Sequence, residues 1–428
     1  MEPAKSKTTI LGLGISGFQA ARFLHRRGYR VFVTELQAKP ELRDRCSQLR
    51  ELGIEVEIGT HSLDRIRASD WVMVSPGIPP FSPVYQAVRD AGIPLYSEIE
   101  VASWFSKSRH LIAVTGTCGK TTVTVLLTEL LKKAGHRAVS CGNIGNPWIG
   151  EIDAIRENDY AVLEVSSFQL EHCKDFSPHY AILTNLGDNH LDWHPTVADY
   201  VKAKLRIFSA QRPGSWALVR RKDRERYFPD EAFRAQLVYY DEYPAADENQ
   251  MILQCMAQKM GLRGTLADEV VRDFQGIEHR TERVAEKEGI CFVNDSKCTT
   301  VESLIWALGK YDDQKVLLIA GGHPKADNFS DARTMVSQKA RIVFLIGEAR
   351  PLLRAAWSQN ADLREVDDLK SAVHRASEEA RPGDVVLLSP ACASFDQFKN
   401  YMDRGCQFKS FVRELLAGSA SCGKEAPR

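Results

Sequence analysis

The 428-residue chain carries 56 lysines plus arginines and 56 aspartates plus glutamates, so its formal net charge is zero. This length predicts two or three domains, because a domain commonly has about 100 to 200 residues. The balanced charge provides no global field that would draw the chain to nucleic acid or to anionic lipid. We therefore expect a small-molecule partner, no nucleic-acid or membrane partner, and a monomer.

The N-terminal segment and the cysteines bear on the compartment. Residues 1–9 are charged, and Gly12, Gly14 and Gly17 interrupt the apolar run that follows, so this end resembles neither a secretory signal nor a membrane span. The ten cysteines have no repeated C-x-x-C spacing, which favours reduced structural thiols over a disulfide framework or a zinc site. Both features predict a cytoplasmic protein.

A pattern of short apolar strand, glycine-rich turn and helical periodicity restarts three times along the chain, which is typical of parallel sheets with crossover helices. The clearest predicted strands are residues 8–11, 31–33, 71–74, 111–114, 316–320, 342–346 and 385–388. We predict an α/β protein with a Rossmann-like domain at 1–98, a central P-loop-type ATPase domain with a parallel sheet at 99–276, and a Rossmann-like domain at 277–428. The stretch 220–269 is assigned no function.

The first glycine loop, residues 12–17 (GLGISG), lies between the first strand and the helical stretch 18–27. Glycines at this spacing let the backbone approach a diphosphate, and the helix N-terminus supplies unpaired amides. Glu35 follows the second predicted strand and lies where an acidic residue commonly meets a ribose or base. The turn Ser75-Pro76-Gly77 is expected at the same edge. The motif predicts a nucleotide without saying which one.

The second glycine loop, residues 115–122 (TGTCGKTT), lies between the strand 111–114 and the helix 123–133. Its amides, the Lys120 ammonium and the Thr121 hydroxyl can converge on a triphosphate and its Mg²⁺. Val114 stands where a full Walker loop has its first glycine, so the loop is a shortened G-x-x-G-K-T form. Two phosphate loops in one chain predict ATP at one of them and a ligand with its own diphosphate at the other.

The motifs along the chain resemble those of the Mur ligase family. They are the two loops above and the runs 142–145 (GNIG), 164–171 (EVSSFQLE), 190–192 (HLD), 203–206 (AKLR), 279–280 (HR), 294–297 (NDSK) and 389–398 (SPACASFDQF). The runs at 164–171 and 389–398 favour the branch that adds D-glutamate. The resemblance implies ATP-dependent joining of D-glutamate to UDP-N-acetylmuramoyl-L-alanine through an acyl phosphate, in peptidoglycan precursor synthesis.

The resemblance also implies roles for individual residues. The catalytic group would be Lys120, Glu164, His190 and Lys204. Thr121 and Glu164 would hold one Mg²⁺, and His190 and Lys204 a second, with Lys204 carbamylated by CO₂. The ATP-binding residues would be Gly116, Thr117, Cys118, Gly119, Lys120, Thr121, Thr122, His279, Arg280 and Asp295.

The remaining implied residues bind the two other substrates. Ser16, Glu35, Gly77 and Asn143 would contact the uridine-diphosphate substrate. D-Glutamate carries two carboxylates, and its pocket would be formed by Lys297, Thr299, Lys325, Ser394, Phe395 and Tyr401.

The chain departs from the family pattern at a few positions. Cys118 replaces an asparagine common in the ATP loop, and Asn189 replaces an aspartate. An H-N-x-x-N run becomes 248–252 (ENQMI) and loses its second asparagine, which affects an adenine or ribose contact. Three alternatives stay open from the residues: another amino-acid ligase of the family, an NAD-dependent oxidoreductase, and a nucleotide-binding regulator without catalysis.

Overall fold

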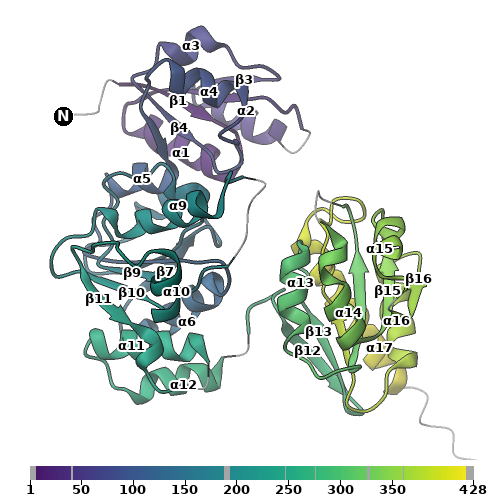
Figure 1. Cartoon of the computed structure of the whole chain (residues 1–428). Helices are drawn as coiled ribbons and strands as arrows, with labels where there is room; N and C mark the ends of the chain where they lie inside the picture. The colour runs from purple at the N-terminus through teal and green to yellow at the C-terminus, as the bar shows by residue number, and fades with distance from the viewer. Residues whose placement is uncertain are drawn as a thin grey trace, which may run out of the picture. The chain divides into compact units, whose positions relative to one another are not determined.

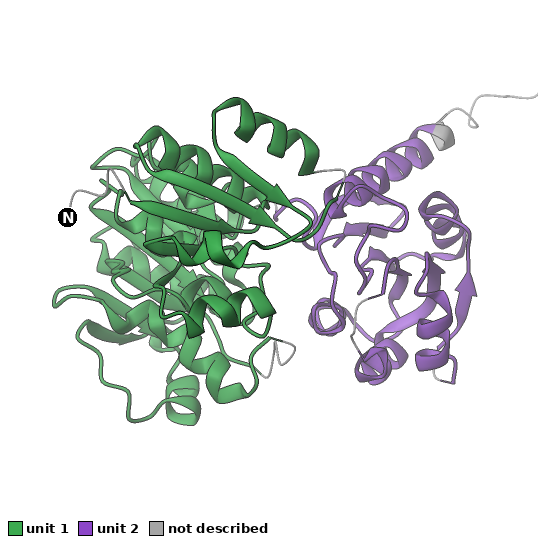
Figure 2. Ribbon diagram, turned by 90° about the horizontal axis from the view of Figure 1, so that it is seen from above, with its two compact units in different colours: residues 1–274 green, residues 275–428 purple. Residues whose placement is uncertain are grey.

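The computed structural model describes residues 6–39, 42–187, 193–245, 247–274, 276–324, 328–359 and 361–420. Contacts divide the chain into two compact units, residues 1–274 and 275–428 (Figure 2). Within the described residues the strands form two sheets in the first unit and one in the second. The predicted α/β fold class with three sheet domains is confirmed.

The N-terminal domain is built on a parallel sheet with the order β3-β2-β1-β4-β5. Its elements are β1 (Lys7–Leu11), α1 (Ile15–Arg26), β2 (Arg30–Glu35), α2 (Arg43–Glu51), β3 (Glu55–Ile58), α3 (Leu63–Arg67), β4 (Trp71–Val74), α4 (Pro83–Asp90) and β5 (Leu95–Ser97). Strand β1 lies between β2 and β4, so the strand order reverses there. Open parallel sheets bind ligands at such a reversal, beyond the carboxyl ends of the strands.

The central domain has a parallel sheet with the order β11-β10-β9-β6-β8-β7. Its elements are α5 (Glu98–Ser103), β6 (His110–Thr115), α6 (Lys120–Lys133), β7 (Ala138–Gly142), α7 (Trp148–Glu151), β8 (Tyr160–Glu164), α8 (Ser167–Leu170), β9 (Tyr180–Leu183), α9 (Val197–Ser209), β10 (Trp216–Val219), α10 (Arg221–Tyr227), β11 (Gln236–Tyr239), η2 (Tyr240–Glu242), α11 (Glu248–Lys259) and α12 (Thr265–Asp273). Strand β6 lies between β8 and β9, so the loops after all three strands meet at one edge.

The second unit has a mixed sheet with the order β12-β13-β17-β14-β15-β16, in which only the pairing of β12 with β13 is antiparallel among the described strands. Its elements are β12 (Glu282–Lys287), β13 (Ile290–Asn294), α13 (Val301–Leu308), β14 (Val316–Gly321), η3 (Phe329–Ala332), α14 (Arg333–Lys339), β15 (Ala340–Ile346), α15 (Arg350–Trp357), β16 (Leu363–Glu365), α16 (Leu369–Glu379), β17 (Val385–Leu388) and α17 (Tyr401–Ala420). The antiparallel edge strand β12 was not predicted.

Helices cover both faces of the third sheet, as Figure 1 shows for α13 and α14 on one side and α16 and α17 on the other. Every residue of β14 is buried. Leu318 and Ala320 pack into one core cluster, whereas Leu317 and Ile319 pack into another. Successive side chains of a strand point to opposite faces, so a strand covered on both faces has a continuous apolar sequence.

Two predicted strands, 71–74 and 385–388, have the predicted bounds. The helix predicted from residue 123 instead begins at Lys120. Its first turn is polar, so apolar periodicity does not reveal it, whereas Gly119 in the left-handed conformation (φ 80°) marks the true start. The stretch 220–269 folds into regular elements, and Ile252 and Leu253 of α11 pack into the core beside α6. No described helix is long and apolar enough to cross a bilayer.

Candidate functional site

The first glycine loop connects β1 to α1. Gly12 has φ 96°, and a Cβ on Gly17 would collide with the carbonyl oxygen of Gly12, so both positions need glycine. The Glu35 carboxylate accepts from the Leu13 amide at 3.0 Å. Ser75 Oγ donates to Gly12 O at 3.4 Å. The structure therefore brings the glycine loop, the end of β2 and the turn after β4 together.

The two other predicted residues of this region lie nearby in the chain. Ser16 is half-buried in the first turn of α1, and Gly77 is exposed in the turn after β4. Helix α1 begins at Ile15, its N-cap residue Gly14 provides no side-chain cap, and the first-turn amides of a helix lack intrahelical partners. This geometry suits an anionic group above the loop.

A pocket lies between the turn after β4 and the segment around α8, inside the first unit. It is lined by Val74, Ser75, Pro76, Ile78, Pro80, Tyr85, Phe168, Gln169, Glu171, His172 and Trp193. Tyr85 Oη and His172 Nε2 share a hydrogen bond of 3.2 Å. Burial lowers the pKa of His172 to about 4, so its ring is neutral at pH 7. Burial also raises the pKa of Glu171. The aromatic walls are suited to stacking against a ring.

The second glycine loop connects β6 to α6. Gly116 has φ 150°, and a Cβ there would collide with Thr184 Oγ1. The Thr117 amide donates to Asn185 O, and the Cys118 amide donates to Asn185 Oδ1, both at 2.9 Å. The loop's first amides are therefore used by the segment after β9. The amides of residues 119–122 begin helix α6, where they have no intrahelical acceptor and can meet phosphate oxygens.

Two lysines meet at one carbonyl oxygen of this loop. Lys120 Nζ donates to Gly116 O at 2.9 Å and to Thr117 O at 2.8 Å. Lys204 Nζ, from α9, donates to the same Gly116 O at 2.8 Å and lies 4.6 Å from the centre of the Tyr200 ring. Burial, and then the charge of Lys120, lower the pKa of Lys204 well below its usual range. The structure therefore brings Lys204 next to the loop.

Oxygen groups lie next to these lysines. Glu164 ends β8, is 1% exposed, and accepts from Asn143 Nδ2 at 2.9 Å through Oε1. Thr121 Oγ1 is buried and has no hydrogen-bond partner among the described residues. A buried hydroxyl on the first turn of a P-loop helix and a buried carboxylate at the end of β8, which pairs with β6, are oxygen ligands of the kind that Mg²⁺ prefers. His190 falls outside the described residues.

The N-terminus of α11 lies against the same loop, which the sequence did not predict. Asn249 Oδ1 is 3.6 Å from where a Cβ on Gly119 would be. Glu248 forms an ion pair with Arg220, and Asn185 Nδ2 donates to Glu248 at 3.5 Å. The only sequence signal for this contact was the run 248–252, which resembles H-N-x-x-N without its second asparagine. This run forms the start of α11.

In the second unit, the predicted ATP-binding residues surround a strained turn. His279 (φ 64°) and Thr281 (φ 43°) adopt a conformation that favours glycine. Asp295 accepts from the Thr281 amide at 3.1 Å and from Ser389 Oγ at 2.8 Å. Burial raises the pKa of Asp295 to about 6. Arg280 Nε is buried and has no hydrogen-bond partner in the described part of the chain. Perturbed carboxyls and strained backbone are features of ligand sites.

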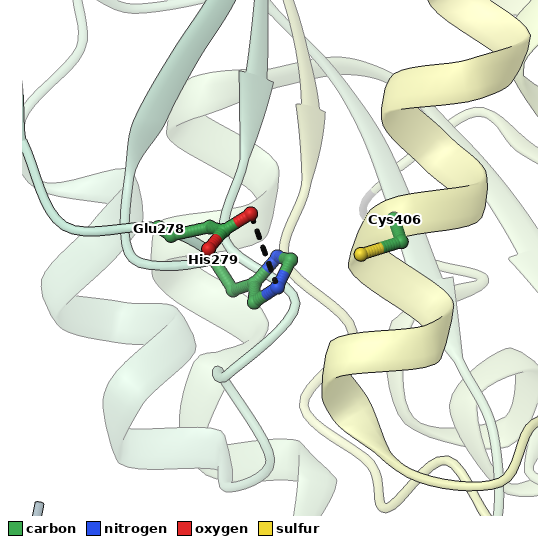
Figure 3. Close-up of side chains that lie close together, drawn as sticks. All are labelled: Glu278, His279 and Cys406. Carbon is green, nitrogen blue, oxygen red and sulfur yellow. Dashed lines mark ion pairs between the residues drawn. The ribbon is translucent and has the colours of Figure 1, made fainter. Parts of the chain in front are cut away.

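Glu278, His279 and Cys406 place a carboxylate, a ring nitrogen and a thiol within 4.8 Å of one another (Figure 3). The surrounding hydrogen bonds argue against a metal there. Asn294 Nδ2 can only donate, and it lies 3.0 Å from His279 Nδ1, so the neutral ring carries its proton on the nitrogen facing Glu278. Lys409 already pairs with Glu278.

The predicted glutamate-binding residues come from loops after β13 and β17 and from the start of α17. Lys297 Nζ lies 5.4 Å from the centre of the Tyr401 ring. Ser394 is 2% exposed, whereas Phe395 is 71% exposed. Thr299 lies in the turn before α13. Lys325 falls outside the described residues. The structure therefore brings Lys297 and Tyr401 together, although they are far apart in the sequence.

Two glycine loops at the carboxyl edges of parallel sheets, the second with two lysines, define an α/β protein that binds phosphate-bearing ligands. Three family models match in order along the chain: Mur ligase MurD-like N-terminal domain over residues 6–97, Mur ligase middle domain over 114–265, and Mur ligase glutamate ligase domain over 279–392. The chain belongs to the Mur ligase family.

Similar curated proteins cover almost the whole chain. One from Chloroherpeton thalassium is 35% identical over 463 residues, with 96% of this chain and 98% of that protein covered. Another, from Acidobacterium capsulatum, is 37% identical over 449 residues, with 96% and 97% covered. Both are named UDP-N-acetylmuramoylalanine--D-glutamate ligase.

Solved structures share the fold. UDP-N-acetylmuramate-alanine ligase MurC from Thermotoga maritima has a TM-score of 0.57 at 18% identity, with 96% of this chain and 100% of that chain covered. MurF ligase from the same organism, in complex with ADP, has a TM-score of 0.57 at 16% identity, with 82% and 91% covered.

Proposed function

We propose that this protein joins D-glutamate to UDP-N-acetylmuramoyl-L-alanine and converts ATP to ADP and phosphate. The observation that carries the proposal is the second glycine loop, where Lys120 and Lys204 meet at Gly116 O beside the buried Glu164. Relatives named for this reaction match 96% of the chain. An NAD-dependent oxidoreductase has no use for a triphosphate loop, and the presence of Lys120, Glu164 and Lys204 argues against a regulator that has lost catalysis.

The reaction starts with transfer of the ATP γ-phosphoryl group to the alanine carboxylate, which gives an acyl phosphate and ADP. The D-glutamate amine then attacks the acyl carbon, phosphate leaves, and an amide forms with loss of a proton from the amine. Charge neutralisation is the main requirement of the first step. Lys120 would leave its loop carbonyls for the β- and γ-phosphates, and the N-terminus of α6 would add its amides. The residues assigned to ATP are Gly116, Thr117, Cys118, Gly119, Lys120, Thr121, Thr122, His279, Arg280 and Asp295.

The metal would be held by oxygen groups of this chain. Thr121 and Glu164 would hold one Mg²⁺, and His190 with Lys204 a second. Bound Mg²⁺ supplies positive charge next to the phosphates. Lys204 suits carbamylation, because CO₂ reacts with a neutral amine, and burial beside Lys120 favours the neutral form. A carbamate would turn this cation into an oxygen ligand.

The diphosphate substrate is assigned to the first domain. Ser16 belongs to the first glycine loop, and Glu35 accepts a hydrogen bond from that loop. Gly77 belongs to the turn after β4, and Asn143 donates to Glu164. The pocket between that turn and α8 is lined by residues of this domain and of the central one. The neutral His172 and the aromatic side chains suit an uncharged ring.

D-Glutamate is assigned to the third domain, through Lys297, Thr299, Lys325, Ser394, Phe395 and Tyr401. The Lys297 ammonium would meet a carboxylate, and the Ser394 hydroxyl would donate to it. The proposal also includes three domains at 1–98, 99–276 and 277–428, a monomeric state and a cytoplasmic location.

Phosphate release from ATP tests the proposal directly. The purified protein is given UDP-N-acetylmuramoyl-L-alanine with D-glutamate, L-glutamate or meso-diaminopimelate. We expect release with D-glutamate only, and loss of release in Lys120→Ala by about 100-fold or more. Release with meso-diaminopimelate alone would assign the protein to another amino acid, and no release with any of them would refute the ligase activity.

A further inference from the structure

Arg404, on α17, is a buried cation without a carboxylate partner. Its side chain is 0% exposed, and no aspartate or glutamate of the described residues lies within ion-pair distance. Burial lowers the pKa of Arg404 to about 10, which leaves it charged at neutral pH. Asp396 and Asp295 stabilise this charge only from beyond ion-pair distance, and a buried charge without an ion pair is costly compared with a neutral side chain of similar size. The guanidinium therefore calls for an explanation beyond packing.

Its hydrogen bonds connect two loops. Nε donates to Ser296 Oγ at 3.0 Å, and Nη2 donates to Ser296 O at 2.8 Å. Nη2 also donates to Cys392 O at 3.1 Å, and Nη1 donates to Ala393 O at 3.3 Å. Ser296 follows β13, whereas Cys392 and Ala393 follow β17, the neighbouring strand. The planar fork of an arginine can hold several oxygens in fixed directions, which a lysine cannot.

A third loop closes on the same guanidinium. A Cβ on Gly322, just after β14, would lie 3.1 Å from Arg404 Nη1 and would collide with Ala393 O. His323 and Ala393 exchange backbone hydrogen bonds of 2.9 Å and 3.0 Å. Strand β17 lies between β13 and β14, so Arg404 is held under the loops of three adjacent strands.

Two of the three anchored residues adjoin a residue that the proposed function assigns to D-glutamate. Ser296 precedes Lys297, and Ala393 precedes Ser394. Ser296 Oγ also donates to Tyr401 O at 2.8 Å. We propose that Arg404 is a positioning residue for the amino-acid pocket, which sets the spacing of Lys297, Ser394 and Tyr401 and adds positive charge beneath an anionic substrate. This inference rests on the proposed function.

The test uses Arg404→Lys, which keeps the positive charge but loses the planar guanidinium with its several donors. Arg413→Met, at an exposed position of the same helix, is the control. We expect the KM for D-glutamate to rise about 10-fold or more in Arg404→Lys, as the loss of one or two charged hydrogen bonds implies. The KM for ATP and that for the uridine substrate should change less than about 2-fold. Arg413→Met should match the wild-type protein.

A structural role alone would lower the active fraction and leave every KM unchanged, and that result would overturn the proposal. A parallel rise in the KM for ATP would also overturn it. Ser296→Ala removes one anchor but keeps the guanidinium, and we expect an intermediate rise in the KM for D-glutamate.

Amide hydrogen exchange makes the test independent of the substrate's identity. Segments 293–298 and 390–395 should exchange faster in Arg404→Lys than in Arg413→Met, and equal exchange would refute the positioning role. If the wild-type protein uses a different amino acid, the proposed function fails, whereas the same KM comparison with that amino acid still decides the role of Arg404.

Discussion

Lys204 and Arg404 occupy similar surroundings and differ in what they can do. Each is at most 1% exposed, and each donates to backbone carbonyl oxygens next to a ligand-binding loop. Burial drives the lysine toward its neutral form, whereas the arginine stays charged. A neutral amine can react with CO₂, whereas a permanent planar cation can hold several oxygens at once. In the roles that we propose, the residue type thus separates a buried cation for chemistry, Lys204, from one for positioning, Arg404.

The largest expected effect comes from replacing Lys204 with a residue of another type. Lys204→Arg keeps a cation that cannot become neutral, so it should lower kcat by about 100-fold or more. Lys204→Ala should lose similar activity but regain part of it with short carboxylates, which can stand in for a carbamate. Lys204→Arg should show no such rescue, because its side chain fills the space. Phosphate release measures both, and full activity of either unrescued variant would contradict the carbamate role.

A second prediction compares the two cations by stability. Arg404→Met removes four hydrogen bonds to oxygens, although the His323 amide still donates to Ala393 O, and it should destabilise its unit by about 3 kcal/mol. Lys204→Met removes one such bond, but it also removes the cost of burying an ammonium group. The two effects oppose each other, so the stability should change by less than about 1 kcal/mol. Denaturant titration followed by hydrogen exchange in each unit separates the two effects. Equal losses would show that the two side chains are not used differently.

Glu98 provides a third case, a buried carboxyl that can shed its charge as Lys204 can. It is 0% exposed, accepts from the Ile149 amide at 2.6 Å, and has its pKa raised by burial to about 7. The folded pKa lies above the unfolded value of 4.5, so the stabilisation is fully present below pH 4.5 and is lost as the pH rises to about 7. The expected change is about 3 kcal/mol.

Glu98→Gln keeps an acceptor for Ile149 and cannot ionise, so it should flatten this part of the pH profile of the first unit. Denaturant titrations between pH 4.5 and 7.5 measure the difference. A mutant profile parallel to that of the wild-type protein would show that Glu98 does not cause the pH dependence.

Much of the fold was predictable because it depends on local sequence. Continuous apolar runs such as 316–320 are typical of strands covered on both faces, and glycine spacing located both phosphate loops. Helix starts with polar first turns, such as that at Lys120, were placed three residues late. The antiparallel β12 was missed because its alternating polar sequence, Glu282–Lys287, has only a weak strand signal.

The sequence by itself determined the family, the two glycine loops and the residue types that a phosphoryl transfer needs. The tertiary structure alone decided that Asn185 and Asn249 lie at the second loop and that Lys204 is buried against Gly116. It also decided that Arg404 holds Ser296, which is 108 residues away in the chain. Arginine and lysine side chains are usually exposed, so composition and periodicity do not predict that Lys204 and Arg404 are buried. Their roles arise from hydrogen bonds between distant segments, which form only when parallel strands bring their loops to one edge.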